Sequence, residues 1–190
     1  MSETRLKIGI TQGDTNGIGW EVILKTFADQ RMAELCTPVI YGSPIAAEYY
    51  RGTIEELENI QFNICQSARE AKRGRVNLVA CGGENLKVEP GKLSQEAGKA
   101  AVEALVKATE ELKAGEIDAV VTAPIDKESV QSESFRYTGH TEFFAAALGG
   151  EPMMIMCSDR LRVGLVTIHI PVSEVSAAIS REKIVARLRQ

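Results

Sequence analysis

The sequence is poor in cysteine, histidine and aromatic residues, and these shortages exclude several classes of protein. Aromatic residues make up only 5% of the chain, which favours aliphatic packing of helices on a sheet over a β-sandwich. The four cysteines form no Cys-x-x-Cys pair, so neither a zinc knuckle nor a redox dithiol is indicated. We interpret Cys36, Cys65, Cys81 and Cys157 as buried thiols of a protein in a reducing cytoplasm.

A basic excess and long hydrophobic runs are also missing. The net charge is −4 and no basic stripe occurs, which argues against a nucleic-acid partner because attraction to phosphates needs clustered cations. The longest uninterrupted apolar run, Phe143–Leu148, is far too short to cross a bilayer. The first residues lack the charged-then-apolar pattern of a signal peptide. We therefore expect a cytoplasmic protein without a membrane partner.

Strand-like and helix-like segments alternate along the chain, which predicts an α/β protein with a largely parallel sheet. A first domain is expected over residues 1–128, and residues 129–190 are expected to begin a second one. In the first, the patterns predict strands at Arg5–Thr11, Pro38–Gly42, Ile60–Cys65, Val76–Ala80 and Ile117–Thr122 (buried), and helices at Trp20–Asp29 and Glu96–Ala114. In the second, they predict a loop at Ser129–Ser134, a hairpin of strands Met153–Cys157 and Leu161–Ile170, and helices at Glu142–Leu148 and Ser173–Gln190.

A glycine-rich segment, Gly13–Gly19, lies between the first expected strand and the first expected helix. Glycines in this place allow a ligand to approach backbone N–H groups at a helix N-terminus. The spacing Gly-x-x-x-Gly-x-Gly differs from the dinucleotide fingerprint, and the Lys-Ser/Thr pair of a phosphate-binding P-loop is missing. The alternative is a tight structural turn capped by Asp14, and the local pattern leaves both interpretations open.

Only two histidines occur in the chain. His169 stands near the carboxyl end of the expected strand Leu161–Ile170, where ligands and catalytic groups gather in α/β sheets. A neutral imidazole there can bind a divalent metal. The alternative is a histidine that only bonds a backbone carbonyl, and its position by itself favours this simpler interpretation.

His140 and Thr141 stand immediately before the expected helix Glu142–Leu148. Free N–H groups and the positive end of the helix dipole make this a natural anion site. The alternative is ordinary N-capping by a threonine, and both interpretations can hold together. Asp126 and Lys127 follow the expected strand Ile117–Thr122 as possible substrate contacts, although solvation of a loop explains them as well.

A catalytic metal usually takes three protein ligands. Two histidines are too few for a three-histidine site, so carboxylates or residues outside this sequence must complete any such site. The chain ends at Gln190 inside an expected helix without a cap. Either this is an ordinary terminal helix or the chain is cut short, and the pattern leaves both interpretations open.

Three segments together resemble the 4-hydroxythreonine-4-phosphate dehydrogenase family of pyridoxal phosphate biosynthesis. They are Ile8–Glu21, the stretch from Val121-Thr-Ala-Pro-Ile-Asp-Lys127 to Tyr137-Thr-Gly-His-Thr-Glu-Phe143, and Arg162–Pro171. Within the first segment, the chain has Gln12, Thr15, Asn16 and Trp20 where the family usually has other residues, mostly prolines. These departures indicate a divergent branch.

The resemblance implies a two-domain α/β/α fold like that of isocitrate and isopropylmalate dehydrogenases, incomplete in this chain. It also implies NAD-dependent and divalent-metal-dependent (Zn, Mg or Co) oxidation of 4-phosphohydroxy-L-threonine, whose 3-oxo product loses carbon dioxide. His140 and Thr141 match the family's substrate-binding pair, and His169 matches one of three metal-binding histidines. A homodimer with the active site at its interface is expected. The chain alone is expected to be inactive, because the other two histidines and most NAD contacts lie in the family's second half.

Three alternatives remain open. The substrate could be a phosphorylated four-carbon sugar acid, because relatives that act on such acids share these motifs. A non-catalytic module that binds a phosphorylated ligand could keep the His140 helix without the cofactor half. An acyl-phosphate transferase on the same type of fold is disfavoured by the segment around His169.

Overall fold

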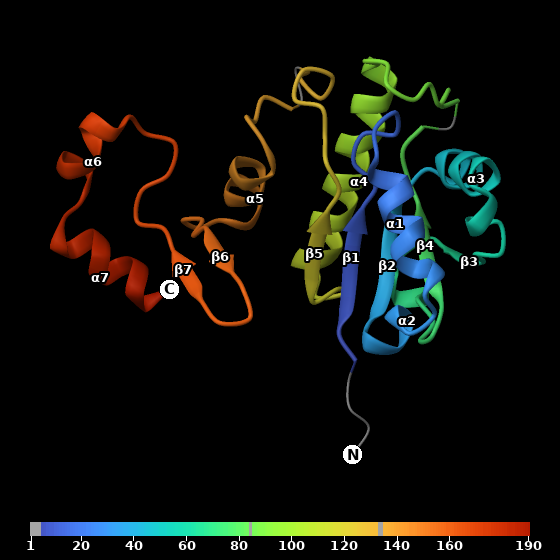
Figure 1. The fold of residues 1–190 in the computed structure, drawn as a ribbon, viewed down its shortest axis with the longest axis horizontal. Helices are drawn as coiled ribbons and strands as arrows, with labels where there is room; N and C mark the ends of the chain where they lie inside the picture. Colours follow the sequence, from blue (N-terminus) through green and yellow to red (C-terminus); the bar gives the residue numbers. More distant parts are fainter. Residues whose placement is uncertain (1–4, 84, 133–134) are drawn as a thin grey trace. The chain divides into compact units, whose positions relative to one another are not determined.

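The structure, a computed structural model, describes residues 5–83, 85–132 and 135–190. The chain divides into two compact units, residues 1–143 and 144–190 (Figure 1). The expected domain boundary between residues 128 and 129 stays a prediction. The last two residues of the expected loop Ser129–Ser134 lie outside the described residues.

The first unit alternates strands with helices, as the patterns predict. Its strands are β1 (Lys7–Thr11), β2 (Thr37–Gly42), β3 (Phe62–Cys65), β4 (Val76–Ala80) and β5 (Ala119–Thr122), and its helices are α1 (Gly19–Ala28), α2 (Met32–Leu35), α3 (Pro44–Thr53), α4 (Gln95–Lys113) and the short 3₁₀ turns η1 (Glu55–Leu57) and η2 (Ala68–Glu70). Helix α5 (His140–Leu148) begins at the end of the first unit and continues into the second. The patterns did not predict α2 and α3, although Ser43-Pro44 is a typical helix start.

All five strands of this unit are parallel and stand in the order β3-β4-β2-β1-β5, so the predicted α/β class is confirmed. The central strand β2 is buried along its whole length. Because the strands are parallel, all their carboxyl ends meet at one edge of the sheet. The loops that follow β1, β2, β4 and β5 therefore share this edge.

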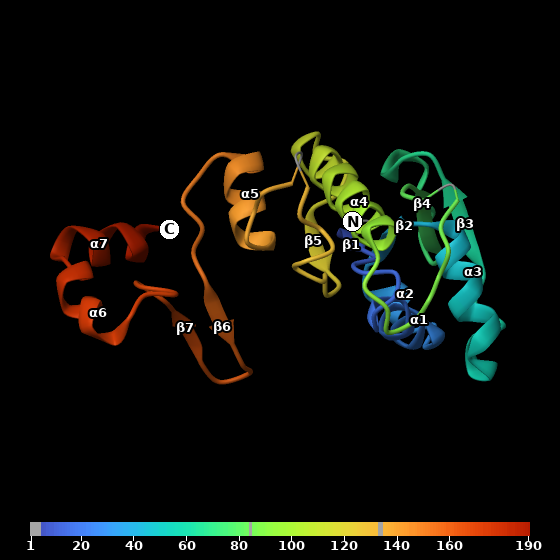
Figure 2. The same ribbon diagram turned by 90° about the horizontal axis from the view of Figure 1, so that it is seen from above.

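Helices cover the two faces of the sheet. Side chains of α1 and α3 pack with Ile40 and Leu78 on one face, and those of α4 pack with Val39 and Val79 on the other. Figure 2 shows α1 and α4 on opposite sides of the strands. The unit is therefore a three-layer α/β/α sandwich.

Helix α4 forms where its sequence predicts it. Its alanines recur at helical spacing and are almost completely buried. The Ser94 hydroxyl accepts a hydrogen bond from the Ala97 N–H at 3.3 Å and caps the first turn. Gly115 ends the helix in the left-handed conformation, with φ of 69°, which glycine adopts without steric cost.

The predicted burial of the segment Ile117–Thr122 is only partly correct. Ile117 is buried, but β5 is half-exposed and the Val121 side chain is 55% exposed. Within the described residues β5 pairs only with β1, so it stands at an edge of the sheet. An apolar run does not by itself distinguish an edge strand from a central one.

The second unit holds a hairpin and two helices. Strands β6 (Ile155–Cys157) and β7 (Arg162–Gly164) pair antiparallel, and the Ser158 N–H donates to the Leu161 carbonyl at 2.8 Å across the predicted turn. The expected strand Leu161–Ile170 is wrong beyond Gly164, because its hairpin partner β6 has only three residues.

The last segment is helical as expected, but it is divided. Helices α6 (Val172–Ala178) and α7 (Arg181–Arg189) are separated at Ile179, whose backbone is extended. The Ser180 hydroxyl caps α7 by accepting from the Lys183 N–H at 3.2 Å. None of the residues in these two helices is buried.

The four cysteines are free thiols, but they are not all buried as predicted. Cys65 is buried, Cys36 and Cys81 are half-buried, and Cys157 is exposed on β6. Among the described residues, no helix is long and apolar enough to cross a membrane.

Candidate functional site

The loops after β1 and β5 lie against each other at the carboxyl edge of the sheet. The Asp14 N–H donates to the Pro124 carbonyl at 2.9 Å. Gly13 takes the left-handed conformation, with φ of 68°, and a Cβ atom at this position would overlap the Pro124 carbonyl. The close approach of the two loops therefore depends on this glycine.

The glycine-rich segment packs against protein at both of its ends. A Cβ atom at Gly19 would stand 2.5 Å from the Gln12 carbonyl oxygen, and Thr15 and Asn16 are buried. The Asn16 side chain accepts from the Glu89 N–H at 2.8 Å and donates to the Lys92 carbonyl at 2.9 Å. These contacts favour the structural-turn interpretation over a ligand cradle.

Asp14 supports this turn as expected. Its carboxylate accepts from the Asn16 N–H at 2.9 Å. The pKa of Asp14 is raised, mainly by burial, against the opposing effect of this hydrogen bond, and the nearby charge of Asp126 adds to the rise. Asp14 and Asp126 therefore bring two carboxylates to the same part of the sheet edge, a proximity that the sequence did not predict.

Asp126 is used by its own loop. Its carboxylate accepts from the Ser129 N–H at 2.7 Å and from the Glu128 N–H at 3.1 Å, an arrangement typical of an Asx turn. Lys127 is exposed. The structure thus explains Asp126 locally, and a role of either residue in substrate contact stays a prediction.

Gln12 is a central residue of this edge that the sequence analysis noted only as a departure from the family. It is fully buried, and its side-chain carbonyl accepts from the Trp20 indole N–H at 3.1 Å and the Ser43 N–H at 2.8 Å. Its amide donates to the Ala100 carbonyl at 3.0 Å. One side chain thereby joins the ends of β1 and β2 to α1 and α4.

His140 and Thr141 occupy the first turn of α5. The sequence pattern placed them before the helix, so the helix begins two residues earlier than expected. An aromatic cluster holds this turn: the Phe143 ring lies 5.5 Å from the Phe135 ring and 5.4 Å from the Tyr137 ring, between centroids. Phe135 is almost completely buried. These contacts attach the start of α5 to the segment before it.

The His140 imidazole is half-buried, and its Nε2 atom is buried without a hydrogen-bond partner among the described residues. Burial lowers the pKa of His140 and so favours the neutral imidazole. A buried polar atom without a partner is costly. An oxygen atom of a ligand at this helix N-terminus would satisfy it.

His169 lies in the second unit, in the irregular segment between β7 and α6, and it is exposed. It is the single non-glycine residue with positive φ in the described part of the chain, with φ of 54°. This conformation is uncommon and carries backbone strain, which often marks functional positions. Because β7 ends at Gly164, the expected position of His169 at the end of a strand is wrong. The metal role of His169 stays a prediction.

The described residues do not by themselves fit a three-ligand metal site. They contain no group of three or more His, Cys, Asp or Glu side chains that could hold a metal ion. A metal role of His169 would therefore need ligands that the described residues do not group with it.

Comparisons with known proteins identify the family. Residues 34–190 match the family model described as pyridoxal phosphate biosynthetic protein PdxA. A 4-hydroxythreonine-4-phosphate dehydrogenase of Bacteroides thetaiotaomicron is 49% identical over 190 residues, which are 99% of this chain and 52% of that protein. A relative from Clostridium botulinum, provisionally named a D-threonate 4-phosphate dehydrogenase, is 31% identical over 93% of this chain and 54% of its own length.

A solved structure supports the same relationship. The crystal structure of a 4-hydroxythreonine-4-phosphate dehydrogenase from Burkholderia phymatum has a TM-score of 0.88 and 29% identity, over 98% of this chain and 57% of that one. The fold is thus the isocitrate dehydrogenase-like fold of these enzymes. The chain spans about half the length of the relatives that it matches, and it belongs to the PdxA family of pyridoxal phosphate biosynthetic proteins.

Proposed function

We propose that the chain forms part of a dehydrogenase that oxidises 4-phosphohydroxy-L-threonine with NAD in pyridoxal phosphate biosynthesis. The 3-oxo product then loses carbon dioxide. Membership of the family and the names of its relatives support this proposal. The enzyme would work in the cytoplasm as a homodimer, with the active site at the interface.

The observation that carries the proposal is the buried, unpartnered Nε2 atom of His140 in the first turn of α5. A phosphorylated substrate is an anion, and the N–H groups and dipole of a helix N-terminus favour an anion. His140 and Thr141 would add side-chain hydrogen bonds at the same place. These residues would bind and orient the substrate.

A divalent metal and NAD are the cofactors of this proposal. His169 would supply one metal ligand, and its strained backbone is consistent with a position held for function. When bound, a divalent metal polarises substrate oxygens and the nicotinamide accepts hydride. Because the described residues form no complete metal site, we assign the steps at the metal to no residue of this chain.

The test is an assay of NADH formation from 4-phosphohydroxy-L-threonine by the protein encoded by the natural reading frame. We expect activity that EDTA abolishes, and loss of about tenfold or more in kcat/KM for His140→Gln, the range for a lost hydrogen bond to a charged group. Glu110→Gln, at an exposed position on α4, is the matched control. Full activity in EDTA would contradict the metal role of His169.

Two alternatives are tested in the same material. The name of the Clostridium botulinum relative favours a phosphorylated four-carbon sugar acid as the second candidate substrate, so kcat/KM should be compared on D-threonate 4-phosphate. The 190-residue chain alone is expected to form no NADH. If the reading frame has a stop codon directly after Gln190, the binding-module alternative takes precedence; two further histidines downstream support the dehydrogenase.

A further inference from the structure

A crevice lies at the carboxyl edge of the sheet, between the ends of β2 and β4. Strands β2 and β4 are neighbours and run parallel, but the chain leaves them in opposite directions. After β2 it enters α3 on one face of the sheet, and after β4 it leads to α4 on the other. Adjacent parallel strands with diverging connections create a crevice between them, and α/β proteins bind ligands at such points.

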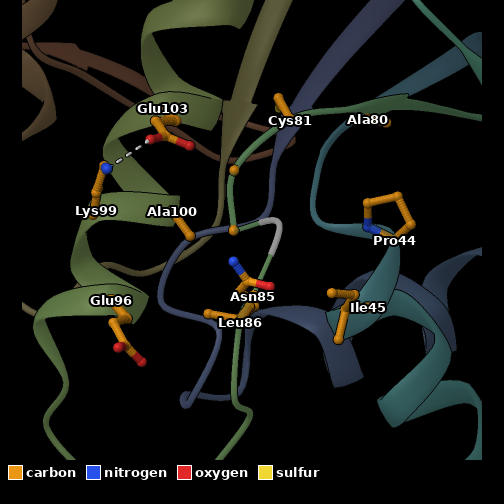
Figure 3. A pocket seen from close by; sticks show the side chains of 12 residues that line it. Pro44, Ile45, Ala80, Cys81, Asn85, Leu86, Glu96, Lys99, Ala100 and Glu103 are labelled. Atoms are coloured by element: carbon orange, nitrogen blue, oxygen red, sulfur yellow. Dashed lines mark ion pairs between the residues drawn. The ribbon is translucent and has the colours of Figure 1, made fainter.

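The structure shows a cavity of about 780 Å³ at this place, within the size range of small-molecule sites. Figure 3 shows its walls: α4 on one side, the start of α3 on the other, and the end of β4 with the following loop between them. The described residues that line it are Pro44, Ile45, Ala80, Cys81, Gly82, Gly83, Asn85, Leu86, Glu96, Lys99, Ala100 and Glu103.

The shape of the crevice depends on a pair of glycines. Gly82 and Gly83 have φ values of 73° and 75°, in the left-handed region. A Cβ atom at Gly82 would stand 2.8 Å from the Ala100 carbonyl oxygen, so the loop passes directly against α4. The Gln12 amide bonds the same carbonyl at 3.0 Å, which fixes this wall to the end of β1.

The two side walls differ in chemistry. The wall from α4 carries the charged lining side chains, Glu96, Lys99 and Glu103, of which Lys99 and Glu103 form an ion pair at 3.8 Å. The opposite wall is apolar, with Pro44 and Ile45, and the loop between the walls adds Leu86 and the amide side chain of Asn85. Among the described lining residues one negative charge is therefore in excess, on the α4 side.

The Cys81 thiol is one of the groups that line the crevice. The pKa of Cys81 is raised to about 12, first by burial and then by the charge of Glu103. Cys81 therefore stays a neutral thiol at physiological pH and adds no reactive thiolate.

The spacing of the carboxylates excludes two kinds of ligand. Glu96 and Glu103 are seven residues apart on one helix, about 10.5 Å along its axis, so they do not chelate one metal ion together. Among the described lining residues an anion would meet an excess of negative charge and no cation outside an ion pair, because Lys99 is paired with Glu103. A molecule with an ammonium group matches the charged wall, and an apolar body matches the opposite one.

We propose that this crevice binds a small organic amine, with its ammonium group at Glu96, the charged lining residue outside the Lys99–Glu103 ion pair, and its apolar body against Pro44, Ile45 and Leu86. Its described lining shares no residue with His140, Thr141 or His169, which the proposed function assigns to a phosphorylated substrate and a metal. It is a second ligand site on the first unit of the chain.

Three probes of similar shape and different charge test the proposal. Phenethylamine, phenethyl alcohol and hydrocinnamate are titrated into the uniformly ¹⁵N-labelled 190-residue chain, and the amide resonances are followed by NMR. We expect the amine to bind most tightly, the alcohol more weakly and the carboxylate most weakly. The shifts should be largest at Gly82, Gly83 and Asn85.

Variants separate binding in the crevice from binding elsewhere. Glu96→Gln removes the partner of the ammonium group and should weaken the amine about two- to fivefold, the range for an exposed charge pair. Glu103→Gln leaves the Lys99 cation unpaired in the crevice and should also weaken the amine, and both variants should leave the alcohol unchanged. Glu110→Gln, exposed on the same helix outside the crevice, is the matched control. Unchanged spectra of the free variants show that they fold.

Four outcomes overturn the proposal. Equal affinity for the three probes would remove the role of charge, and tightest binding of hydrocinnamate would reverse it. Shifts confined to residues outside the crevice, or none at millimolar phenethylamine, would show that the crevice binds no amine. None of these outcomes bears on the dehydrogenase proposal, whose test uses a different ligand.

Discussion

Replacement of Gln12 by alanine should strongly destabilise the first unit of the chain. The side chain is fully buried and its carbonyl accepts from two donors, the Trp20 indole N–H at 3.1 Å and the Ser43 N–H at 2.8 Å. In Gln12→Ala both donors lose this partner inside the protein. The third bond, to the Ala100 carbonyl at 3.0 Å, is lost as well.

The size of the effect follows from the cost of buried groups without partners. Each orphaned donor costs about 1–3 kcal/mol, so two of them lower the free energy of unfolding by about 2–6 kcal/mol. The removed side-chain atoms also leave a void, which places the expected loss in the upper half of that range. Domains of this size have about 5–15 kcal/mol in total, so the variant should be close to the limit of folding.

Urea unfolding followed by tryptophan fluorescence measures this loss directly. Trp20 is the only tryptophan in the sequence, it is fully buried, and its indole donates to Gln12. Gln95→Ala, at an exposed position at the start of α4, is the matched control and should change the free energy by less than about 0.5 kcal/mol. A loss below about 1 kcal/mol for Gln12→Ala, at unchanged m-value, would refute the reasoning.

Three further predictions concern stability, pH and thiol reactivity. Ser94→Ala removes the cap of α4 and should cost about 1 kcal/mol in urea unfolding, whereas an unchanged midpoint would show that the cap is replaced by water. The raised pKa of Asp14 means that this carboxyl favours folding below its unfolded pKa, and that the benefit is lost as pH rises through its folded pKa. Asp14→Asn, which keeps the acceptor for the Asn16 N–H, should therefore be more stable than the wild type at neutral pH, and this advantage should vanish below the carboxyl range. In native protein an alkylating reagent should modify the exposed Cys157 well before the buried Cys65 or before Cys81, whose pKa is raised to about 12. Mass spectrometry of digests identifies the order of modification. Equal rates would contradict the burial that the structure shows.

The local elements of this protein are determined by its sequence. Helix α4 follows from alanines at helical spacing, a serine before the first turn and a glycine after the last. Strand β4 lies at Val76–Ala80, as its apolar run predicts. The signals that predict them lie within each segment, although β4 itself is completed by its pairing with β2 and β3.

The candidate site could be predicted only in part. The residue types of His140 and Thr141, and their place at a helix start, are visible in the sequence. The burial of the His140 Nε2 atom is not visible there, because burial depends on which surfaces meet in the folded protein. The predicted position of His169 at a strand end was wrong, because β7 ends at Gly164, where its pairing with β6 stops.

The tertiary structure alone decided the contacts between distant parts of the chain. Gln12 meets Ala100, 88 residues away, and the glycine-rich turn after β1 packs on Pro124 after β5. The order of strands puts β5 at an edge and opens a crevice between β2 and β4. A local pattern carries the periodicity of one element but not the identity of its neighbours, because burial depends on which surfaces meet after the whole sheet has formed.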